Sequence, residues 1–116
     1  MKGSPMSRVV KCGLIQASNV VDPSEPLERI KQAMIDKHVE RIHEAGRRGV
    51  QILCLQEIFY GPYFPAEQNP RWYGMAERIP DGPTVTLMRD LAKTYQMVII
   101  VPIYEEEMTG VYYNTA

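Results

Sequence analysis

The sequence predicts an α/β fold, and three observations support this class. Apolar runs of strand length recur at residues 8–15, 50–55 and 97–101. Both intervals between them carry apolar residues at three- and four-residue steps, the period of an amphipathic helix. The second and third runs lack polar alternation, as expected for strands buried on both faces of a covered sheet. This order predicts strand-helix-strand-helix-strand with a parallel sheet.

The first helix is predicted to run from the Asn19–Pro26 turn region to about Arg48. Ser24 is expected to be its N-cap, with Pro26 in the first turn, where a missing N–H costs little. Glu44 and Arg48 stand four residues apart and predict a favourable ion pair, and Gly49 is expected to end the helix. The predicted core stripe consists of Leu27, Ile30, Met34, Ile35, Val39, Ile42 and Ala45.

The second half of the chain is predicted to be less regular. Residues 61–82 show no period and contain four prolines, which indicates a long loop of the kind that covers a functional site. Thr84 is expected to be the N-cap of the second helix. Glu105–Glu107 are predicted to form a solvated turn, and residues 111–116 a last strand that closes a β-hairpin. We therefore assign residues 8–116 to one domain and expect residues 1–7 to be disordered or expression-derived.

Composition excludes several functions. A net charge of −1 provides no basic surface for nucleic acid or an anionic membrane, and no stretch is long and apolar enough to span a membrane. Cys12 and Cys54 both lie in apolar runs without metal-ligand spacing, which predicts core residues in a reducing compartment, the cytoplasm. There is no glycine-rich phosphate loop. We expect no metal and no organic cofactor.

One carboxylate stands where α/β folds bind ligands, just beyond the carboxyl end of a strand. Glu57 follows the run at 50–55 and precedes an aromatic turn, so it is a candidate general base. Tyr60, Tyr63 and Phe64 follow closely enough to contact its substrate, although hydrophobic cover or an oligomer contact is an equal alternative. Cys54 is rejected as a nucleophile because its odd spacing from Glu57 directs the two side chains apart, and its apolar neighbours disfavour a thiolate.

Five blocks of sequence together carry a family resemblance. They are Leu14-Ile-Gln-Ala17, Leu53-Cys-Leu-Gln-Glu57, Asp81-Gly-Pro-Thr84, Val98–Pro102 and Tyr113-Asn-Thr-Ala116. The chain resembles the nitrilase superfamily of carbon–nitrogen hydrolases from Arg8 onward. Gln56 before the acid and the aromatic turn after it resemble the branch of β-ureidopropionases and N-carbamoylputrescine amidases.

The resemblance implies the N-terminal part of an α-β-β-α sandwich with a Glu-Lys-Cys triad. Glu57 matches the glutamate. The lysine and the cysteine lie further along in such proteins and are not among these 116 residues, so we expect the N-terminal portion of a longer or truncated enzyme. One face of its sheet, including Val98–Val101 and the last strand, is expected to lack a covering layer.

The implied reaction is hydrolysis of an N-carbamoyl amide, of the β-ureidopropionate or N-carbamoylputrescine type, to an amine, CO2 and ammonia. The expected partners are a small-molecule substrate and further copies of the same chain in a homo-oligomer. The 116-residue segment alone is expected to be inactive. Three alternatives stay open: a catalytically silent binding or assembly module, another amidase of the superfamily, and a flavodoxin-like domain in which Glu57 is incidental.

Overall fold

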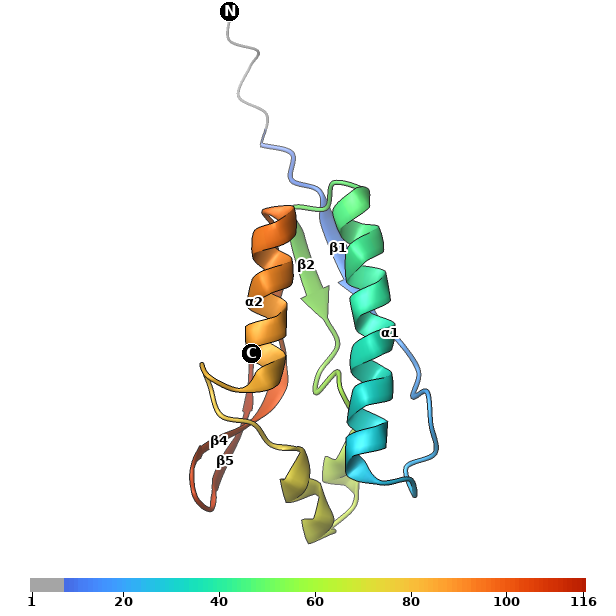
Figure 1. Ribbon diagram of the computed structural model, residues 1–116, viewed down its shortest axis with the longest axis vertical. Coiled ribbons are helices and arrows are strands. Elements are labelled where there is room, and N and C mark those ends of the chain that lie inside the picture. The colour runs from blue at the N-terminus through green and yellow to red at the C-terminus, as the bar shows by residue number, and fades with distance from the viewer. Residues whose placement is uncertain (1–7) are drawn as a thin grey trace, which may run out of the picture.

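A computed structural model describes residues 8–116, and the predicted N-terminal segment 1–7 lies outside them. Its elements are β1 (Cys12–Ile15), α1 (Leu27–Arg47), β2 (Ile52–Leu55), α2 (Pro83–Tyr95), β3 (Val98–Ile100), β4 (Ile103–Met108) and β5 (Val111–Thr115), with two short 3₁₀ helices at Phe64–Ala66 and Pro70–Met75. β1, β2 and β3 form one sheet, and β4 and β5 form a separate hairpin at one end of the molecule (Figure 1). The predicted α/β class and element order are confirmed.

β2 is the central strand of the three-stranded sheet. It pairs in parallel with β1 on one side and with β3 on the other, with Leu53 opposite both Gly13 and Ile99. Parallel strands end at the same edge of a sheet. The segments that follow Ile15 and Leu55 therefore start next to each other.

The predicted start of α1 is wrong in detail. Pro26, with φ −55° and ψ 142°, is the N-cap and provides no side-chain hydrogen bond. Ser24 instead lies in a preceding turn, where its N–H donates to Asp22 Oδ1 at 2.8 Å. The end of the helix is as predicted: Gly49 has φ +75°, and Arg48 Nε lies 3.8 Å from Glu44 Oε1.

The predicted cap of α2 is also wrong. Gly82 is the N-cap and Pro83 occupies the first turn, so Thr84 lies inside the helix. The Thr84 N–H is instead satisfied by the Glu77 carboxylate at 2.8 Å. A Cβ at Gly82 would lie 2.4 Å from the Arg78 carbonyl oxygen. The close approach needs glycine, which cannot supply a capping side chain.

The predicted hairpin is confirmed, but the predicted turn at Glu105–Glu107 is wrong, because these glutamates lie inside β4. Glu105 pairs with Tyr113 and Glu106 with Tyr112, so aromatic cross-strand neighbours support them. The turn is at Gly110, with φ +82°. The run of charges did not require a loop, because Glu105 and Glu106 are only half-buried and Glu107 is exposed, so a strand can carry them here.

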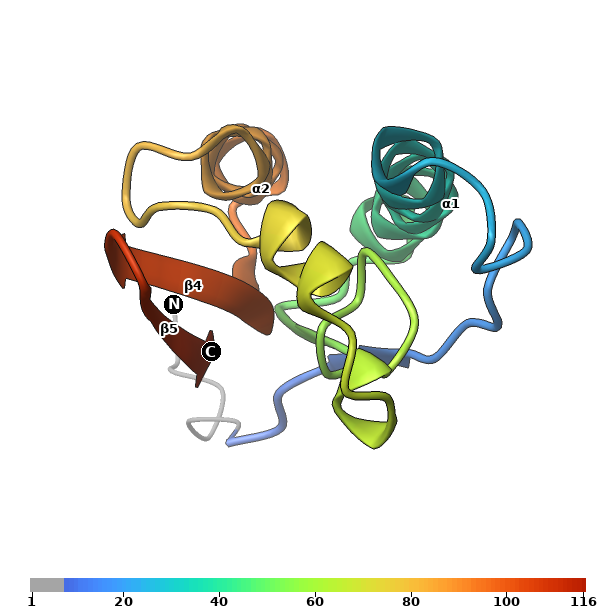
Figure 2. The same cartoon turned by 90° about the horizontal axis from the view of Figure 1, so that it is seen from below.

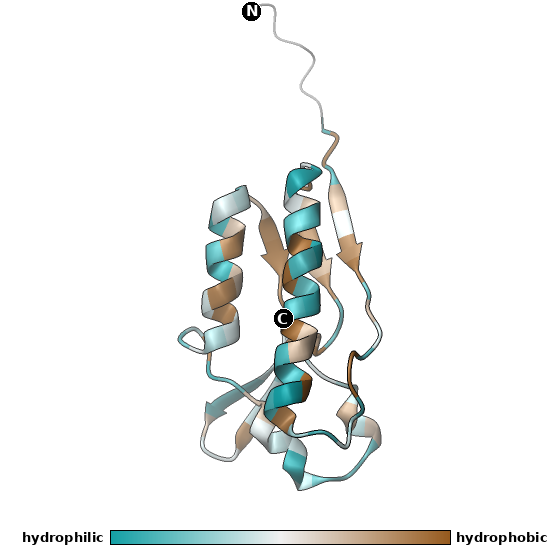
Figure 3. Ribbon diagram, turned by 45° about the vertical axis from the view of Figure 1, so that its right-hand side comes forward, coloured by the Kyte–Doolittle hydropathy of each residue, from teal (hydrophilic) through white to brown (hydrophobic). Residues whose placement is uncertain are grey.

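Both helices cover one face of the sheet and leave the other open (Figure 2). The covered face packs against the stripe of α1, whose buried members are Ile30, Met34, Ile35, His38, Ile42 and Ala45. On the open face, Leu14 is 84% exposed, Val98 59% and Ile100 40%, and the strands are strongly hydrophobic (Figure 3). The expected uncovered face is confirmed for Val98 and Ile100, but the last strand does not belong to it, because β5 pairs only with β4 in the separate hairpin. The expectation of strands buried on both sides is not met within residues 8–116.

Candidate active site

Glu57 lies directly after β2, at the carboxyl edge of the sheet. The next residue, Ile58, has φ +46°, a backbone conformation that is rare for a β-branched residue and costs roughly 1–3 kcal/mol. Ile58, Phe59 and Tyr60 are all buried, whereas Glu57 is exposed. The turn is thus held by three core side chains, and its first residue is presented to the surface.

The Glu57 carboxylate has one hydrogen-bond donor within residues 8–116. The Asn114 side-chain amide, on β5, donates to Glu57 Oε1 at 2.5 Å. The second carboxylate oxygen, Oε2, has no such partner in the described part of the chain. Among the described residues, Glu57 is therefore held through one oxygen, and the other has no protein partner. The role of Asn114 was not predicted, although it belongs to one of the blocks that carry the family resemblance.

An open groove of about 530 Å³ runs past Glu57. Its walls come from the loop after β1 and from the turn after β2, and it is lined by Gln16, Ala17, Ser18, Asn19, Gln56, Glu57, Gly61 and Tyr63. The two walls are joined where the Ala17 N–H donates to Gln56 Oε1 at 2.5 Å. Tyr63 is 59% exposed in this groove. The structure thus brings Glu57 together with Tyr63.

The other two aromatic candidates lie elsewhere. Tyr60 is 0% exposed, and its hydroxyl donates to the Tyr104 carbonyl and accepts from the Tyr104 N–H, both at 3.1 Å. Burial raises the pKa of the Tyr60 phenol. Phe64 is half-buried and stacks on Trp72, with ring centroids 5.8 Å apart. Tyr60 joins the turn to β4, Phe64 packs on Trp72 and Tyr104, and neither lines the groove that contains Glu57.

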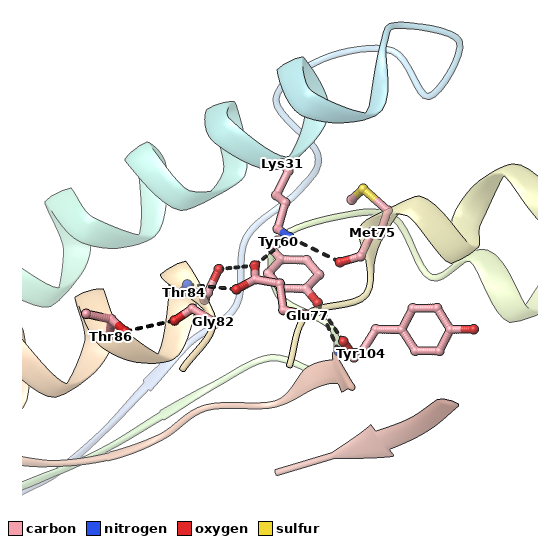
Figure 4. A network of polar contacts seen from close by, with 8 residues as sticks. All are labelled: Lys31, Tyr60, Met75, Glu77, Gly82, Thr84, Thr86 and Tyr104. Carbon is pink, nitrogen blue, oxygen red and sulfur yellow. Dashed lines mark hydrogen bonds and ion pairs between the residues drawn. The ribbon is translucent and has the colours of Figure 1, made fainter. Parts of the chain in front are cut away.

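A second carboxylate, which sequence reasoning missed, is buried between the two helices (Figure 4). Glu77 is 6% exposed and forms an ion pair with Lys31. It accepts hydrogen bonds from the Thr84 N–H at 2.8 Å and from the Thr84 hydroxyl. Lys31 Nζ also donates to the Met75 carbonyl at 3.1 Å and lies 4.4 Å from the Tyr60 ring centroid. Glu77 has a full set of partners and joins α1, the second 3₁₀ helix and α2.

The remaining titratable groups do not form a second centre. Within residues 8–116 there is no group of three or more His, Cys, Asp or Glu side chains that could hold a metal ion. No helix in the same range is long and apolar enough to cross a membrane. His38 is fully buried and bonds through Nδ1 to the Met34 carbonyl at 2.8 Å. His43 lies 2.5 Å from the Tyr95 hydroxyl. Neither histidine lines the groove that contains Glu57.

Comparison with known proteins gives a consistent result. The carbon-nitrogen hydrolase family model matches residues 13–116. A β-ureidopropionase from Arabidopsis thaliana is 39% identical over 111 residues, which cover 94% of this chain and 27% of that protein. An N-carbamoylputrescine amidase from the same plant is 35% identical over 75 residues, 65% of this chain and 25% of that protein.

A solved structure supports the same fold. The crystal structure of a carbon-nitrogen hydrolase from Helicobacter pylori G27 superimposes with a TM-score of 0.72 at 20% identity, covering 90% of this chain and 33% of that one. This likeness bears on the fold alone. The chain thus spans between a quarter and a third of the length of the proteins that it matches.

Proposed function

This chain belongs to the carbon-nitrogen hydrolase family, and on that premise we propose that it is the N-terminal part of a longer amidohydrolase in which Glu57 is the general base. The term complete enzyme is used below for that longer protein, which includes this chain and the remaining region that its relatives contain. The flavodoxin-like alternative is set aside by the family match. The 39% identity to a β-ureidopropionase of which this chain covers 27% supports this proposal.

One observation supports the role of Glu57 most directly. It is an exposed carboxylate at the carboxyl edge of the sheet, it is oriented by Asn114 through a single oxygen, and it borders an open groove. A general base must reach the proton that it removes and keep a lone pair free for it. Glu57 meets both requirements, whereas the buried and fully bonded Glu77 meets neither.

The proposed reaction follows the family's triad. A cysteine thiol of the complete enzyme loses its proton to Glu57 and attacks the carbamoyl carbon, and a lysine stabilises the oxyanion that forms. Ammonia leaves with the proton that Glu57 returns, which leaves the carbamoyl group bound to the cysteine sulfur as a thiocarbamate. Water, deprotonated by Glu57, then cleaves the C–S bond, and the carbamate formed breaks down to CO2 and the free amine. Neither the thiol nor the lysine is assigned to a residue of this chain, and no cofactor takes part.

We propose an N-carbamoyl amide of the β-ureidopropionate or N-carbamoylputrescine type as the substrate. The support is the 39% and 35% identity to enzymes named for these substrates, together with Gln56 before the acid, a position at which the chain resembles that branch. The predicted core position is wrong for Cys12, which is exposed, and Cys54 is half-buried, so a cytoplasmic location is proposed only from the fact that both are free thiols. A homo-oligomer is proposed from the resemblance to the family.

The test of this function is Glu57→Gln in the complete enzyme, assayed for ammonia release from both carbamoyl substrates. The amide keeps the size of the side chain but cannot accept the proton, so we expect turnover to fall by at least ~10²-fold, the usual scale for a positioned base. Melting temperature is expected to change little, since Glu57 is exposed. The matched control is Glu40→Gln, an exposed glutamate on α1. Turnover of Glu57→Gln within a few-fold of the parent would show that this role is wrong, and a parent without activity would favour the silent-module alternative.

The isolated 116-residue chain is proposed to be inactive and prone to association. The open sheet face exposes Leu14, Val98 and Ile100, and exposed apolar surface of this kind promotes association. Ammonia release and light scattering of the purified chain test the two parts of this proposal. A monomer that hydrolyses carbamoyl amides would contradict it.

A further inference from the structure

The hairpin contacts the Glu57 turn at two points. Asn114 Nδ2 donates to Glu57 Oε1 at 2.5 Å, and the Tyr60 hydroxyl bonds both the N–H and the carbonyl of Tyr104 at 3.1 Å. Tyr104 and Asn114 face each other across the hairpin, one on β4 and the other on β5. Both ends of the four-residue turn from Glu57 to Tyr60 are therefore bound to one cross-strand pair.

We propose that Asn114 and Tyr60 are positioning residues that set the orientation of Glu57, an inference that rests on the proposed function of Glu57 as base. A carboxylate whose orientation depends on three rotatable side-chain bonds has many orientations in solvent, and Glu57 is exposed. The Asn114 amide fixes one of its oxygens, which directs the lone pairs of the other. Proton transfer depends on such alignment, and small misplacements of a catalytic group reduce the rate strongly.

Tyr60 acts on the backbone of the turn. Its buried hydroxyl both donates to and accepts from the main chain of Tyr104, so that one side chain joins the turn to β4. A third contact is the Phe59 N–H, which donates to the Pro102 carbonyl at 3.4 Å just before β4. The bonds of Phe59 and Tyr60, which follow Ile58, hold this residue in its positive-φ conformation. They thereby also fix the backbone of Glu57, which precedes Ile58.

The hairpin is itself anchored independently of Glu57. The Glu77 N–H donates to the Tyr104 carbonyl at 3.0 Å, and the Glu106 N–H donates to the Glu77 carbonyl at 2.9 Å. The Glu77 side chain is in turn bonded to Lys31 and Thr84 (Figure 4). The hairpin that carries Asn114 is therefore bonded through Glu77 to both helices. Asn114 can then hold the Glu57 carboxylate in one position.

The decisive experiment compares Asn114→Ala and Asn114→Asp in the complete enzyme. Removing a hydrogen bond to a charged group should lower kcat by about 10- to 100-fold with little change in KM. Aspartate has the size of asparagine but places a second carboxylate against Glu57, so Asn114→Asp should lose at least as much kcat as Asn114→Ala. If Asn114 only filled space in the hairpin, the isosteric aspartate would retain more activity than alanine.

The matched control on the hairpin is Thr115→Val. The Thr115 hydroxyl donates to Glu105 Oε1 at 2.8 Å, so its loss weakens the hairpin without removing the donor to Glu57. We expect a lower melting temperature with kcat unchanged.

Tyr60→Phe tests the second contact. The ring stays buried and only the hydroxyl is lost, and we expect kcat to fall by about tenfold at a temperature where the enzyme is fully folded. Tyr95→Phe is its control, because it removes the phenol that contacts His43 on the far part of α1, and it should affect stability alone.

Two outcomes would overturn the inference: kcat within twofold of the parent for both Asn114 variants, or Asn114→Asp more active than Asn114→Ala. Glu57→Gln is measured beside them. If Glu57→Gln loses turnover while the Asn114 variants keep it, the positioning inference fails and the proposed function stands. If Glu57→Gln keeps turnover, the proposed function itself fails.

Discussion

Glu57 and Glu77 are two carboxylates of the same chain in opposite environments. Glu77 is 6% exposed and is bonded to an ammonium, a backbone N–H and a hydroxyl. Glu57 is exposed and accepts one hydrogen bond, from Asn114. A buried carboxylate must have its charge compensated at every lone pair, or its desolvation destabilises the fold. A carboxylate that performs proton transfer must keep a lone pair uncommitted.

This difference matches a structural role for Glu77 and the catalytic role proposed for Glu57. The partners of Glu77 come from α1 and α2, so its bonds fix the relative position of two helices. The partner of Glu57 comes from the hairpin, so its bond fixes one side-chain orientation. We therefore expect substitutions at the two positions to change different measured quantities.

The largest expected effect is that Glu57→Gln lowers turnover and Glu77→Gln lowers the free energy of unfolding. Glu77→Gln leaves Lys31 without its counter-charge, and we expect the free energy of unfolding to fall by roughly 3 kcal/mol, the scale for breaking a largely buried ion pair. Turnover per folded molecule should fall much less than in Glu57→Gln, because Glu77 does not border the groove and its backbone bonds to Tyr104 and Glu106 on the hairpin remain. Denaturant unfolding and kcat, measured on both variants of the complete enzyme, check the two halves. Equal loss of turnover in both variants would remove the distinction.

The double variant Lys31→Met with Glu77→Gln sharpens the same comparison. Removal of both charges leaves neither one uncompensated, so the pair should be less destabilised than the sum of the two single variants predicts. Additive losses would show that the ion pair itself contributes little to the stability.

Glu57 could be predicted from sequence and Glu77 could not, for physical reasons. Glu57 follows an unbroken apolar run, so its place at a strand end was evident, and family blocks surround it. Glu77 lies in an irregular segment without period, and its partners Lys31 and Thr84 are 46 and 7 residues away in the sequence. A usable signal was the start of α2: Gly82 and Pro83 offer no capping side chain, so a carboxylate from elsewhere was needed.

The errors within the elements have a related cause. Ser24 and Thr84 have the right chemistry for caps, but the neighbouring prolines and Gly82 decided where the helices begin. Glu105–Glu107 look like a solvated turn, but their tyrosine partners on β5 place them in a strand. Tyr60 follows Glu57 closely in sequence, but the positive φ of Ile58 turns it into the core. Tertiary contacts decided each of these positions.

A smaller effect is expected for Thr84→Val. This change keeps the size of the side chain and the backbone N–H bond to Glu77 but removes the hydroxyl donor, so the buried carboxylate loses one partner. We expect the free energy of unfolding to fall by about 2 kcal/mol. Thr86→Val is the matched control on the same helix, because its hydroxyl donates to the uncharged Gly82 carbonyl at 2.9 Å in a more exposed position. A control variant as destabilised as Thr84→Val would show that the charge of Glu77 is not what matters.

Tyr63→Ala and Phe64→Ala test the groove beside Glu57. Tyr63 borders the groove, whereas Phe64 packs on Trp72 and Tyr104. We expect Tyr63→Ala to raise KM several-fold, equivalent to about 1 kcal/mol, with little change in melting temperature. Phe64→Ala is expected to lower the melting temperature with a smaller change in KM. Steady-state kinetics on both carbamoyl substrates decide this, and an unchanged KM in Tyr63→Ala would assign Tyr63 to surface cover.

The smallest expected effect is a pH dependence of stability from His38. This side chain is fully buried against Phe59, with ring centroids 4.9 Å apart, and within residues 8–116 its Nε2 is a buried atom without a hydrogen-bond partner. Burial lowers the pKa of His38 below the ordinary value of 6.5, and the nearby Lys37 charge acts in the same direction. Above pH 6.5 the imidazole is neutral in both the folded and the unfolded chain, so it adds no pH dependence. Below pH 6.5 the unfolded chain binds the proton first, so stability falls with decreasing pH, by at most about 1.4 kcal/mol per unit.

His38→Gln is neutral at every pH and can still donate to the Met34 carbonyl, so the stability difference between pH 7.5 and pH 5.5 should be smaller in this variant than in the parent. Thermal unfolding of both proteins at the two pH values measures that difference, and identical pH profiles would mean that His38 remains uncharged in the unfolded chain or gains a proton freely in the folded one.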